Sequence, residues 1–246
     1  MQASDLSRLS LPSDPQISPD GTRIAFVVSR PDLDEDRYHR TIWVWDGESA
    51  NAFTHGPADF NPRWSPDGRT LAFLRGGGTP DKPPQVALIP AGGGEARILT
   101  DIELGCEEVE WSPDGSALAA VGVGYVEEWA GLDEAERARR PRRVTDVPFR
   151  FDNMGWIHDR KRHVWLVEAS GENEPRCLTD GPFDERFIAW RPDGSSIAFH
   201  TDRSPRRAFE DGADLYEVEV ESGEMRRIAE RGSWSFPTFR PDGTLH

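Results

Sequence analysis

Lysine is almost missing from this chain of 246 residues, because Lys82 and Lys161 are the only lysines among 29 basic residues. Acidic residues number 44, which leaves a net charge of −15 at neutral pH. A protein that binds nucleic acid needs a basic stripe on its surface, since contacts with phosphates supply much of the affinity. The composition therefore argues against a nucleic-acid partner.

Cysteine and long apolar runs are scarce as well. Cys106 and Cys177 are the two cysteines, and no Cys-x-x-Cys spacing indicates a metal site. The longest apolar stretch, residues 117–126, is broken by glycines and is far shorter than the roughly 20 residues of a membrane helix. The first five residues show neither the basic start nor the apolar core of a secretory signal. We therefore expect no membrane partner and a cytoplasmic location.

The sequence also lacks the motifs of common catalytic sites. A serine hydrolase of the α/β type carries a Gly-x-Ser-x-Gly elbow, whereas the segment GSWSF from Gly232 lacks the final glycine. His158 and His163 flank Asp159, but two imidazoles without a third ligand make a weak metal site, and surface or structural roles are the alternative. We predict no catalytic residue, no cofactor and no metal in this chain.

What the chain does contain is one turn motif in five copies. Each copy has the form Ser/Arg-Pro-Asp-Gly. Proline presets φ, the aspartate side chain bonds its own backbone, and glycine ends the turn without the steric penalty of a Cβ. A short apolar strand follows every copy, so the motif predicts strand, tight turn and strand. The copies begin at Ser18, Ser65, Ser112, Arg191 and Arg240, which are separated by steps of 47, 47, 79 and 49 residues.

A second series of landmarks has a similar period. Short segments that end near a threonine recur at Thr54, Thr100, Thr145 and Thr179, with Ala229 as the last equivalent. The steps of 46, 45, 34 and 50 residues divide the long step between turns into two units. This interpretation predicts a degenerate repeat near Pro148 that has lost its Pro-Asp-Gly turn.

Segments of alternating apolar and polar residues supply the missing strands of each repeat, at 41–46, 84–91, 162–169 and 213–220. Four strands in about 45 residues are typical of a β-propeller blade. We predict an all-β chain that is a β-propeller of four-stranded antiparallel blades, with five blades, the start of a sixth and an incomplete ring. The expected boundaries are 12–56, 57–102, 103–147, 148–181 and 182–232, with the next blade starting at 233–246.

A helical insertion interrupts the third repeat at residues 126–143. Its segment LDEAERARR combines good helix formers with acids that precede bases. Glu127 and Glu128 become candidates for binding a substrate ammonium group if the insertion faces a cavity. Solvated surface acids are the alternative.

Arg150 is the third candidate for substrate gating. It alternates along one predicted strand with Phe149 and Phe151, and neighbouring side chains of a strand point to opposite faces. With the two phenylalanines packed between blades, Arg150 would face the channel and hold a peptide carbonyl or carboxylate. A structural pairing with a nearby carboxylate is the alternative. Gly155 is expected to supply either a backbone with positive φ or a close approach that a Cβ would obstruct.

Two long segments resemble a known family. The opening SDPQISPDGTRIAFVVSRPDLDEDRYHRTIWVWD is similar to the first propeller blade of the prolyl-oligopeptidase family of serine peptidases, in its branch of acylaminoacyl and dipeptidyl peptidases. Residues 142–167, RRVTDVPFRFDNMGWIHDRKRHVWLV, resemble a degenerate mid-propeller blade of that family. The matching positions are Arg150, Asp152, Gly155, Asp159, Arg162 and His163.

The resemblance covers essentially the whole chain, but only the amino-terminal half of such an enzyme. It implies that the catalytic α/β-hydrolase domain, with its Ser, Asp and His, is absent from these residues. In the family, the propeller forms a lid that filters substrates by size. No catalytic residue can be carried over to this chain, and Asn153-Met154 departs from the small residues that are usual there.

Two functions from different classes follow. The first is the substrate-gating propeller portion of a serine peptidase that acts on short peptides or N-acylated amino acids and peptides. Such a chain is not catalytic by itself, and meets its peptide or acyl-peptide substrate through the missing hydrolase domain. The second is a non-catalytic, protein-binding propeller like TolB, whose blades carry the same turn. A Gly-x-Ser-x-Gly elbow downstream of His246 in the reading frame would favour the peptidase.

Overall fold

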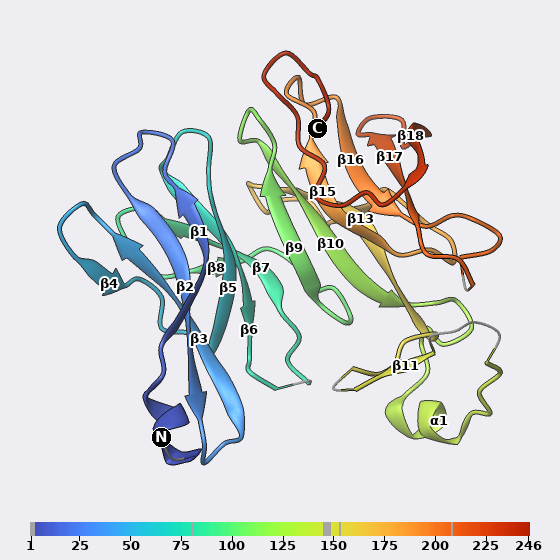
Figure 1. Ribbon diagram of the computed structural model, residues 1–246, viewed down its shortest axis with the longest axis horizontal. Helices are drawn as coiled ribbons and strands as arrows, with labels where there is room; N and C mark the ends of the chain where they lie inside the picture. Colours follow the sequence, from blue (N-terminus) through green and yellow to red (C-terminus); the bar gives the residue numbers. More distant parts are fainter. Residues whose placement is uncertain (1–2, 80, 145–148, 153, 208) are drawn as a thin grey trace.

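The computed structural model describes residues 3–79, 81–144, 149–152, 154–207 and 209–246. Almost all regular structure in these residues is β-strand, organised in successive four-stranded antiparallel meanders (Figure 1). These meanders are the blades of a β-propeller, which confirms the predicted fold class. No helix of the described residues is long and apolar enough to cross a membrane.

The first two blades follow a short 3₁₀ helix, Ala3–Arg8, and lie side by side in one extended sheet. A single parallel pairing, between Arg40 and Ala58, joins them. The strands of blade 1 are β1 (Leu11–Ile17), β2 (Ile24–Asp32), β3 (Arg37–Trp45) and β4 (Ala50–Ala52). Those of blade 2 are β5 (Ala58–Trp64), β6 (Thr70–Gly76), β7 (Gln85–Pro90) and β8 (Arg97–Ile98).

The next two blades are separate four-stranded sheets. The strands of blade 3 are β9 (Cys106–Trp111), β10 (Ala117–Tyr125), β13 (Arg160–Glu168) and β14 (Arg176–Cys177). Those of blade 4 are β15 (Glu185–Trp190), β16 (Ser196–Thr201), β17 (Ala213–Glu219) and β18 (Met225–Gly232). After blade 4 the chain makes one further isolated bridge, between Phe239 and Leu245.

The predicted blade count was wrong, because 103–147 and 148–181 do not form separate blades. Strand β13 pairs with β10 in continuous register from Ala117↔Glu168 to Tyr125↔Arg160, so the two predicted units supply two strands each to one sheet. The described residues therefore hold four complete blades instead of five. The long step between turns contains an insertion, residues 126–159, between the second and third strands of blade 3. Thr145, which suggested an extra unit, lies outside the described residues.

The packing of the turns shows the same succession of blades. A Cβ built on Gly115 of the third turn would lie 3.5 Å from Pro66 of the second, and one on Gly194 would lie 4.0 Å from Pro113 of the third. The turns that begin at Ser112 and Arg191 thus belong to neighbouring blades, although 79 residues separate them in the sequence.

The insertion contains the helix that the sequence predicted. Helix α1 (Glu134–Arg139) begins with a capping box, in which Asp133 accepts from the Glu136 amide and Glu136 accepts from the Asp133 amide. Strands β11 (Arg150–Phe151) and β12 (Gly155–Trp156) form a hairpin apart from the blades. Gly155 has φ of 68°, the first of the two expected alternatives. In Figure 1 helix α1 and strand β11 lie beyond the end of β10.

Three of the predicted threonine landmarks have a shared structural role. Thr54, Thr100 and Thr179 are buried. Each threonine Oγ1 accepts a hydrogen bond from one backbone amide within the third strand of its blade. The donors are Ile42, Val86 and Val164, at 3.0, 3.0 and 2.9 Å. A buried amide without a partner would cost free energy, so the threonine recurs at the end of each of these blades.

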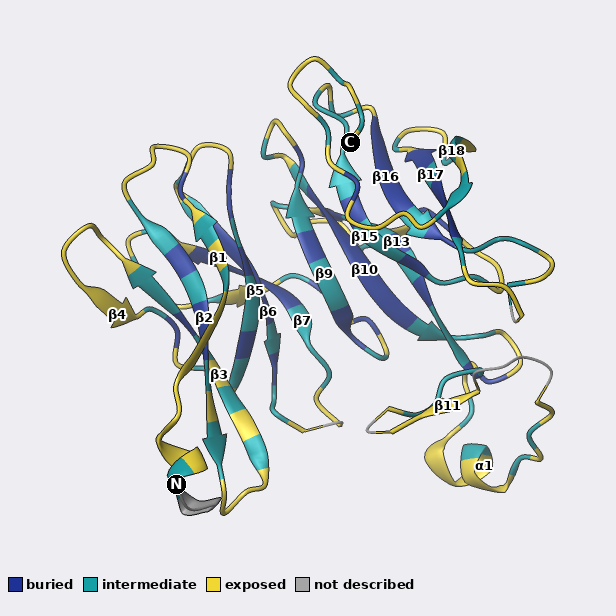
Figure 2. Cartoon of the chain, in the orientation of Figure 1, coloured by how far each residue is buried: buried dark blue, intermediate teal, exposed yellow. Residues whose placement is uncertain are grey.

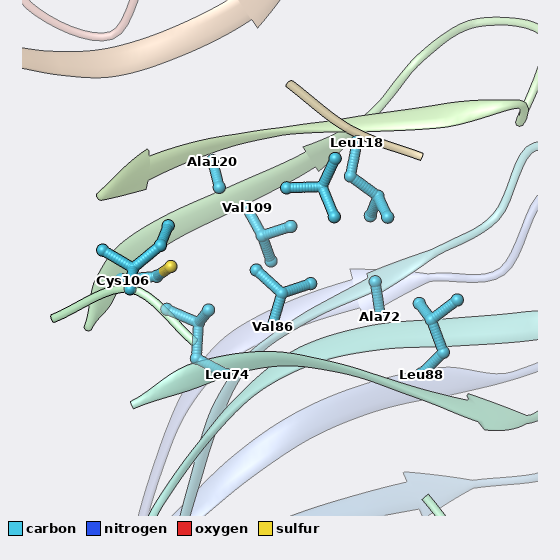
Figure 3. Close-up of a cluster of buried hydrophobic side chains, with 10 residues drawn as sticks. Ala72, Leu74, Val86, Leu88, Cys106, Val109, Leu118 and Ala120 are labelled. Atoms are coloured by element: carbon cyan, nitrogen blue, oxygen red, sulfur yellow. The ribbon is translucent and has the colours of Figure 1, made fainter. Parts of the chain in front are cut away.

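The apolar core lies between neighbouring blades. Figure 2 shows buried residues along the strand centres and exposed residues in the connecting loops. Figure 3 shows one such cluster, in which Leu74 and Val86 of blade 2 face Cys106, Val109 and Leu118 of blade 3. Similar clusters join blade 1 to blade 2 and blade 3 to blade 4. Because each sheet buries side chains on its neighbours, the blades hold one another in place.

Acid is expected to weaken the turns, because hydrogen bonds hold the aspartate pKa values below their ordinary range. The Ser18 hydroxyl, 2.5 Å from Asp20, contributes most to lowering the pKa of Asp20 to about 2. A folded pKa below the unfolded value of about 3.9 means that the ionised turn adds stability above pH ~4. This contribution is lost as the pH falls from about 4 towards 2.

A carbon-detected NMR titration of the Asp20 carboxyl group measures this directly. We expect a midpoint near pH 2 in the intact chain, and a return towards about 3.9 in Ser18→Ala, which lacks the largest donor. An Asp20 midpoint near the ordinary value in the unaltered chain would contradict the assigned hydrogen bonds.

Candidate functional site

The first strands of successive blades, β1, β5, β9 and β15, pack against one another towards the middle of the molecule (Figure 1). In β1, β5 and β15 the pairing register shifts within the strand, as in a β-bulge. Asp14, Asn61 and Phe187 lie at these shifts with φ of 48°, 56° and 54°. Bulges redirect side chains, and Asp14 and Asn61 point towards the neighbouring first strand, where they contact Arg63 and Val109.

Polar side chains at the bulges bond the backbone of the next blade. The Asn61 side-chain oxygen accepts from the Val109 amide at 2.9 Å. The Glu108 carboxylate accepts from two successive amides, those of Phe187 at 3.0 Å and Ile188 at 3.2 Å. Burial raises the pKa of Glu108, although these two amides oppose the effect. The inner strands are therefore joined by side chain to backbone bonds as well as by apolar contact.

An ion-pair network spans the first three blades on the same strands. Arg63 Nη1 lies 3.1 Å from the Asp14 carboxylate, and Arg63 Nε lies 2.5 Å from Glu110. Burial alone would lower the pKa of Arg63, but the charges of Glu110 and Asp14 outweigh it and raise the value. Burial also raises the pKa of Glu110. This surface combines carboxylates with a partly buried guanidinium, a pattern suited to holding polar groups of a peptide.

Beyond blade 4 the inner surface becomes aromatic. Phe187 and Phe236 have ring centroids 4.1 Å apart, and His200 packs 5.5 Å from Phe187. Phe236 is 67% exposed. Burial lowers the pKa of His200, and the charge of Arg186 adds to this effect, so the imidazole is neutral at pH 7.

The structure places the three predicted gating residues on the exposed insertion. Glu127 and Glu128 are exposed, and Glu128 pairs with Arg140 at 2.8 Å. Arg150 lies in strand β11 with its guanidinium carbon 5.8 Å from the Trp156 ring. In the described part of the chain, no contact brings these three residues together. Their gating role stays a prediction.

One expectation about Arg150 was wrong. Phe149 and Phe151 are 37% and 47% exposed and do not pack between blades, because their hairpin belongs to the insertion and not to the ring. Phe149 instead contacts Trp156 within the insertion, with ring centroids 5.8 Å apart. The phenylalanines therefore give no support for the expectation that Arg150 faces a channel.

Described residues from both ends of the insertion pack around one buried aromatic residue. Trp129 is 3% exposed and meets His158 edge to face at 5.9 Å. The Arg142 guanidinium lies 4.3 Å from the Trp129 ring and donates to Asp159 at 2.7 Å. Burial would raise the pKa of Asp159, but hydrogen bonds from Arg160 and Arg142 outweigh it and lower the value. These contacts give His158 and Asp159 structural roles.

His163 also has a structural position. Its Nδ1 lies 2.9 Å from the buried carboxylate of Glu185 and 3.5 Å from Thr179 Oγ1. Thr179, His163 and Glu185 have the residue types of a catalytic triad but not its function. The Thr179 hydroxyl is buried and already accepts from the Val164 amide, so it is not available as a nucleophile. Burial of the sulfur atoms raises the pKa of the Cys106 and Cys177 thiols to about 12 and about 11, so both are protonated at neutral pH.

One group of metal-binding residue types converges among the described residues. Asp32, Glu35 and His39 lie on the β2–β3 hairpin, and one potential ligand atom from each falls within 4.8 Å of the others. Arg37 forms an ion pair with Glu35, and His39 contacts both carboxylates at 3.2 Å, so these side chains already have partners within the protein. That the chain holds no metal stays a prediction.

Comparison with known proteins adds to this geometry. No family model matches the sequence. The uncharacterized peptidase YuxL of Bacillus subtilis is 35% identical over 207 residues, which cover 80% of this chain and 30% of YuxL. The chain is a relative of the propeller portion of prolyl-oligopeptidase-family peptidases. It spans less than a third of the length of this relative.

Solved structures agree on the fold. The acylaminoacyl peptidase of Pyrococcus horikoshii matches 93% of this propeller chain and 34% of its own, with a TM-score of 0.67 and 23% identity. A putative TolB of Agrobacterium tumefaciens matches 94% of this chain and 71% of its own, with a TM-score of 0.59 and 17% identity. Both likenesses show the propeller fold alone.

Proposed function

We propose that this chain is the substrate-gating propeller portion of a serine peptidase that acts on short peptides or on N-acylated amino acids and peptides, and that it is not catalytic by itself. The observation that carries the proposal is the 35% identity to YuxL over four-fifths of the chain. The likeness to the acylaminoacyl peptidase structure is consistent with the propeller fold that this proposal requires. We include a cytoplasmic location in this proposal.

The chemistry of the described residues is consistent with a supporting role. Both thiols are kept protonated, and the one threonine–histidine–glutamate contact is buried and structural. The inner strands instead offer fixed polar groups on a rigid framework, and binding functions commonly depend on such positioned groups. A ring of this kind over a buried nucleophile would admit an extended peptide, exclude a globular protein and limit access of water.

Two measurements test the proposal. The purified chain 1–246 should show no turnover of peptidyl or acyl-aminoacyl chromogenic substrates, and robust turnover would overturn the proposal. The reading frame downstream of His246 should encode a Gly-x-Ser-x-Gly elbow that follows a strand and precedes a helix. A stop codon after one more blade would instead support the alternative, a non-catalytic TolB-like binding propeller, which the match to 71% of the putative TolB favours.

Arg150→Ala in the whole enzyme is expected to raise KM for charged or longer substrates without a change in melting temperature. Arg150 is exposed, and a substitution on the surface away from ion pairs usually alters stability by less than about 0.5 kcal/mol. Arg139→Ala, which removes another exposed arginine from the same insertion, is the matched control and should leave KM unchanged. A lower melting temperature with unaltered kinetics for Arg150→Ala would assign Arg150 a structural role only.

A further inference from the structure

The joint between blades 1 and 2 contains an arginine that covers a tryptophan. The guanidinium carbon of Arg23 lies 4.5 Å from the centre of the Trp64 ring. Its two terminal nitrogens donate to the carbonyl oxygens of Ala91, at 2.8 Å, and Gly68, at 3.2 Å. Under this cover Trp64 is only 8% exposed. The first joint thus shows how a guanidinium fits on the ring face between two blades.

The next two joints repeat the tryptophan but not the arginine. Trp111 and Trp190 occupy the position of Trp64, and each donates its indole N–H to a carbonyl of the preceding blade's first strand, as Trp64 does. The distances are 3.1, 2.9 and 3.1 Å for Trp64, Trp111 and Trp190. The residues equivalent to Arg23, however, are Thr70 after the second turn and Ala117 after the third. Trp111 and Trp190 are only partly buried.

Open grooves lie where the arginine is missing. A groove of about 720 Å³ between blades 3 and 4 is lined by Ala117, Trp190, Gly194 and Val220. Gly194 is the turn glycine of blade 4, as Gly68 is of blade 2. Val220 follows the third strand of blade 4, as Ala91 follows that of blade 2. These two residues therefore correspond to Gly68 and Ala91, whose carbonyls accept from Arg23. The groove therefore repeats the ring and the turn glycine that surround the Arg23 guanidinium, while the Val220 carbonyl already accepts from Arg176.

In the second joint another arginine lines the groove. This groove, of about 470 Å³, is lined by Thr70 and Trp111 and also by Arg97. Arg97 reaches from β8 and donates to the Ala169 carbonyl at 2.8 Å. The corresponding Arg176 donates to Val220 in the third joint but is not one of the residues that line the larger groove. The groove between blades 3 and 4 is thus the more open of the two.

The charge of this larger groove matches a cation. Its lining includes the carboxyl groups of Asp114, Glu168 and Asp193, and none of its described lining residues is basic. The hydroxyls of Ser112 and Ser195 donate to Asp114 and Asp193 at 2.7 and 2.6 Å, which lowers the pKa of both carboxyl groups. Both are therefore ionised at neutral pH, in the groove that Trp190 also lines.

We propose that the groove between blades 3 and 4 binds the guanidinium group of an arginine side chain from a polypeptide, stacked on Trp190 as Arg23 is stacked on Trp64. A planar guanidinium stacks on an indole and offers several N–H donors in a fixed plane. The nearby carbonyl and carboxylate oxygens can accept these donors. A lysine ammonium lacks the planar face and is more strongly hydrated, so the groove selects arginine. This site is independent of the proposed peptidase function.

Calorimetric titration of the chain 1–246 with N-acetyl-L-arginine amide tests the proposal. Saturable binding is expected, with N-acetyl-L-lysine amide at least about tenfold weaker, a factor that corresponds to about 1.4 kcal/mol. Ala117→Arg should fill the groove from within and weaken binding of the arginine probe by at least the same factor. Its melting temperature should not fall, because the substitution reproduces the joint that Arg23 already forms.

Thr70→Arg is the matched control, since it places the same side chain in the other groove and should leave the affinity for the probe unchanged. Asp114→Asn combined with Asp193→Asn provides a second test that does not depend on filling the groove, and should also weaken binding. No saturable binding to the unaltered chain, equal binding of the lysine probe, or unchanged affinity in a folded Ala117→Arg chain would overturn the proposal. An equal loss in Thr70→Arg would do the same.

Discussion

Glu185→Ala is expected to lower the free energy of unfolding by about 3–5 kcal/mol, the usual cost of removing one partner from a buried ion pair. The Glu185 carboxylate is completely buried and contacts Arg203 at 2.7 Å, His163 at 2.9 Å and Thr179 at 3.2 Å. These partners come from both blade 3 and blade 4. Alanine would leave the Arg203 guanidinium, which has a buried Nε without another partner, in a cavity without its counter-charge.

Urea denaturation followed by tryptophan fluorescence would measure this loss. Glu172→Ala, which removes an exposed carboxylate from blade 3, is the matched control and should change stability by less than about 0.5 kcal/mol. Glu185→Gln keeps the shape and part of the hydrogen bonding, so its loss should be intermediate. If Glu185→Ala and Glu172→Ala had the same midpoint, the buried cluster would not contribute to holding blades 3 and 4 together.

Features that depend on neighbouring residues could be predicted from the sequence. The Pro-Asp-Gly turns, the strands on either side of them and the capped helix in the insertion all follow from patterns within a few residues. The third strand of blade 3 was also located, at 162–169 against an observed Arg160–Glu168. The pattern of alternation identifies a strand, but it carries no record of which strand is its partner.

The blade count failed for that reason. Whether β13 begins a new blade or completes the third depends on its register with β10, from which 34 residues of insertion separate it, 126–159. The hairpin of β11 and β12 imitates the start of a blade in sequence, although it is too short to continue into a sheet. The spacing of the landmarks is compatible both with two short repeats and with one repeat that contains an insertion.

The inner-strand site was missed although a signal was present. Asp14, Asn61 and Glu108 are separated by 47 residues each, the same step as the first three turns. A residue that stays polar at a fixed distance before each of the first three turns is unexpected in a buried strand. Its role becomes clear only in three dimensions, where the Asn61 and Glu108 side chains bond amides of the next blade. The sequence cannot show that these side chains will point along the sheet towards the next blade.

Gly105→Ala is expected to lower the free energy of unfolding by about 2–5 kcal/mol, because a left-handed backbone and a steric clash act together. Gly105 has φ of 82° and precedes the first strand of blade 3. A Cβ there would lie 2.6 Å from the Pro84 carbonyl oxygen and 2.9 Å from the Pro84 nitrogen. This backbone cannot move away cheaply, since the same carbonyl accepts from the Cys106 amide at 2.7 Å.

Gly93→Ala separates the two causes. Gly93 has a similar φ of 90°, but a Cβ there would meet no atom within 4 Å, so only the backbone cost of about 1–2 kcal/mol applies. The difference between the two variants in urea denaturation therefore measures the close approach of blades 2 and 3 at Pro84. Equal losses would mean that the joint between these blades relaxes around an added methyl group. A larger loss for Gly105→Ala would show instead that the backbone contact at Pro84 fixes how closely the two blades pack.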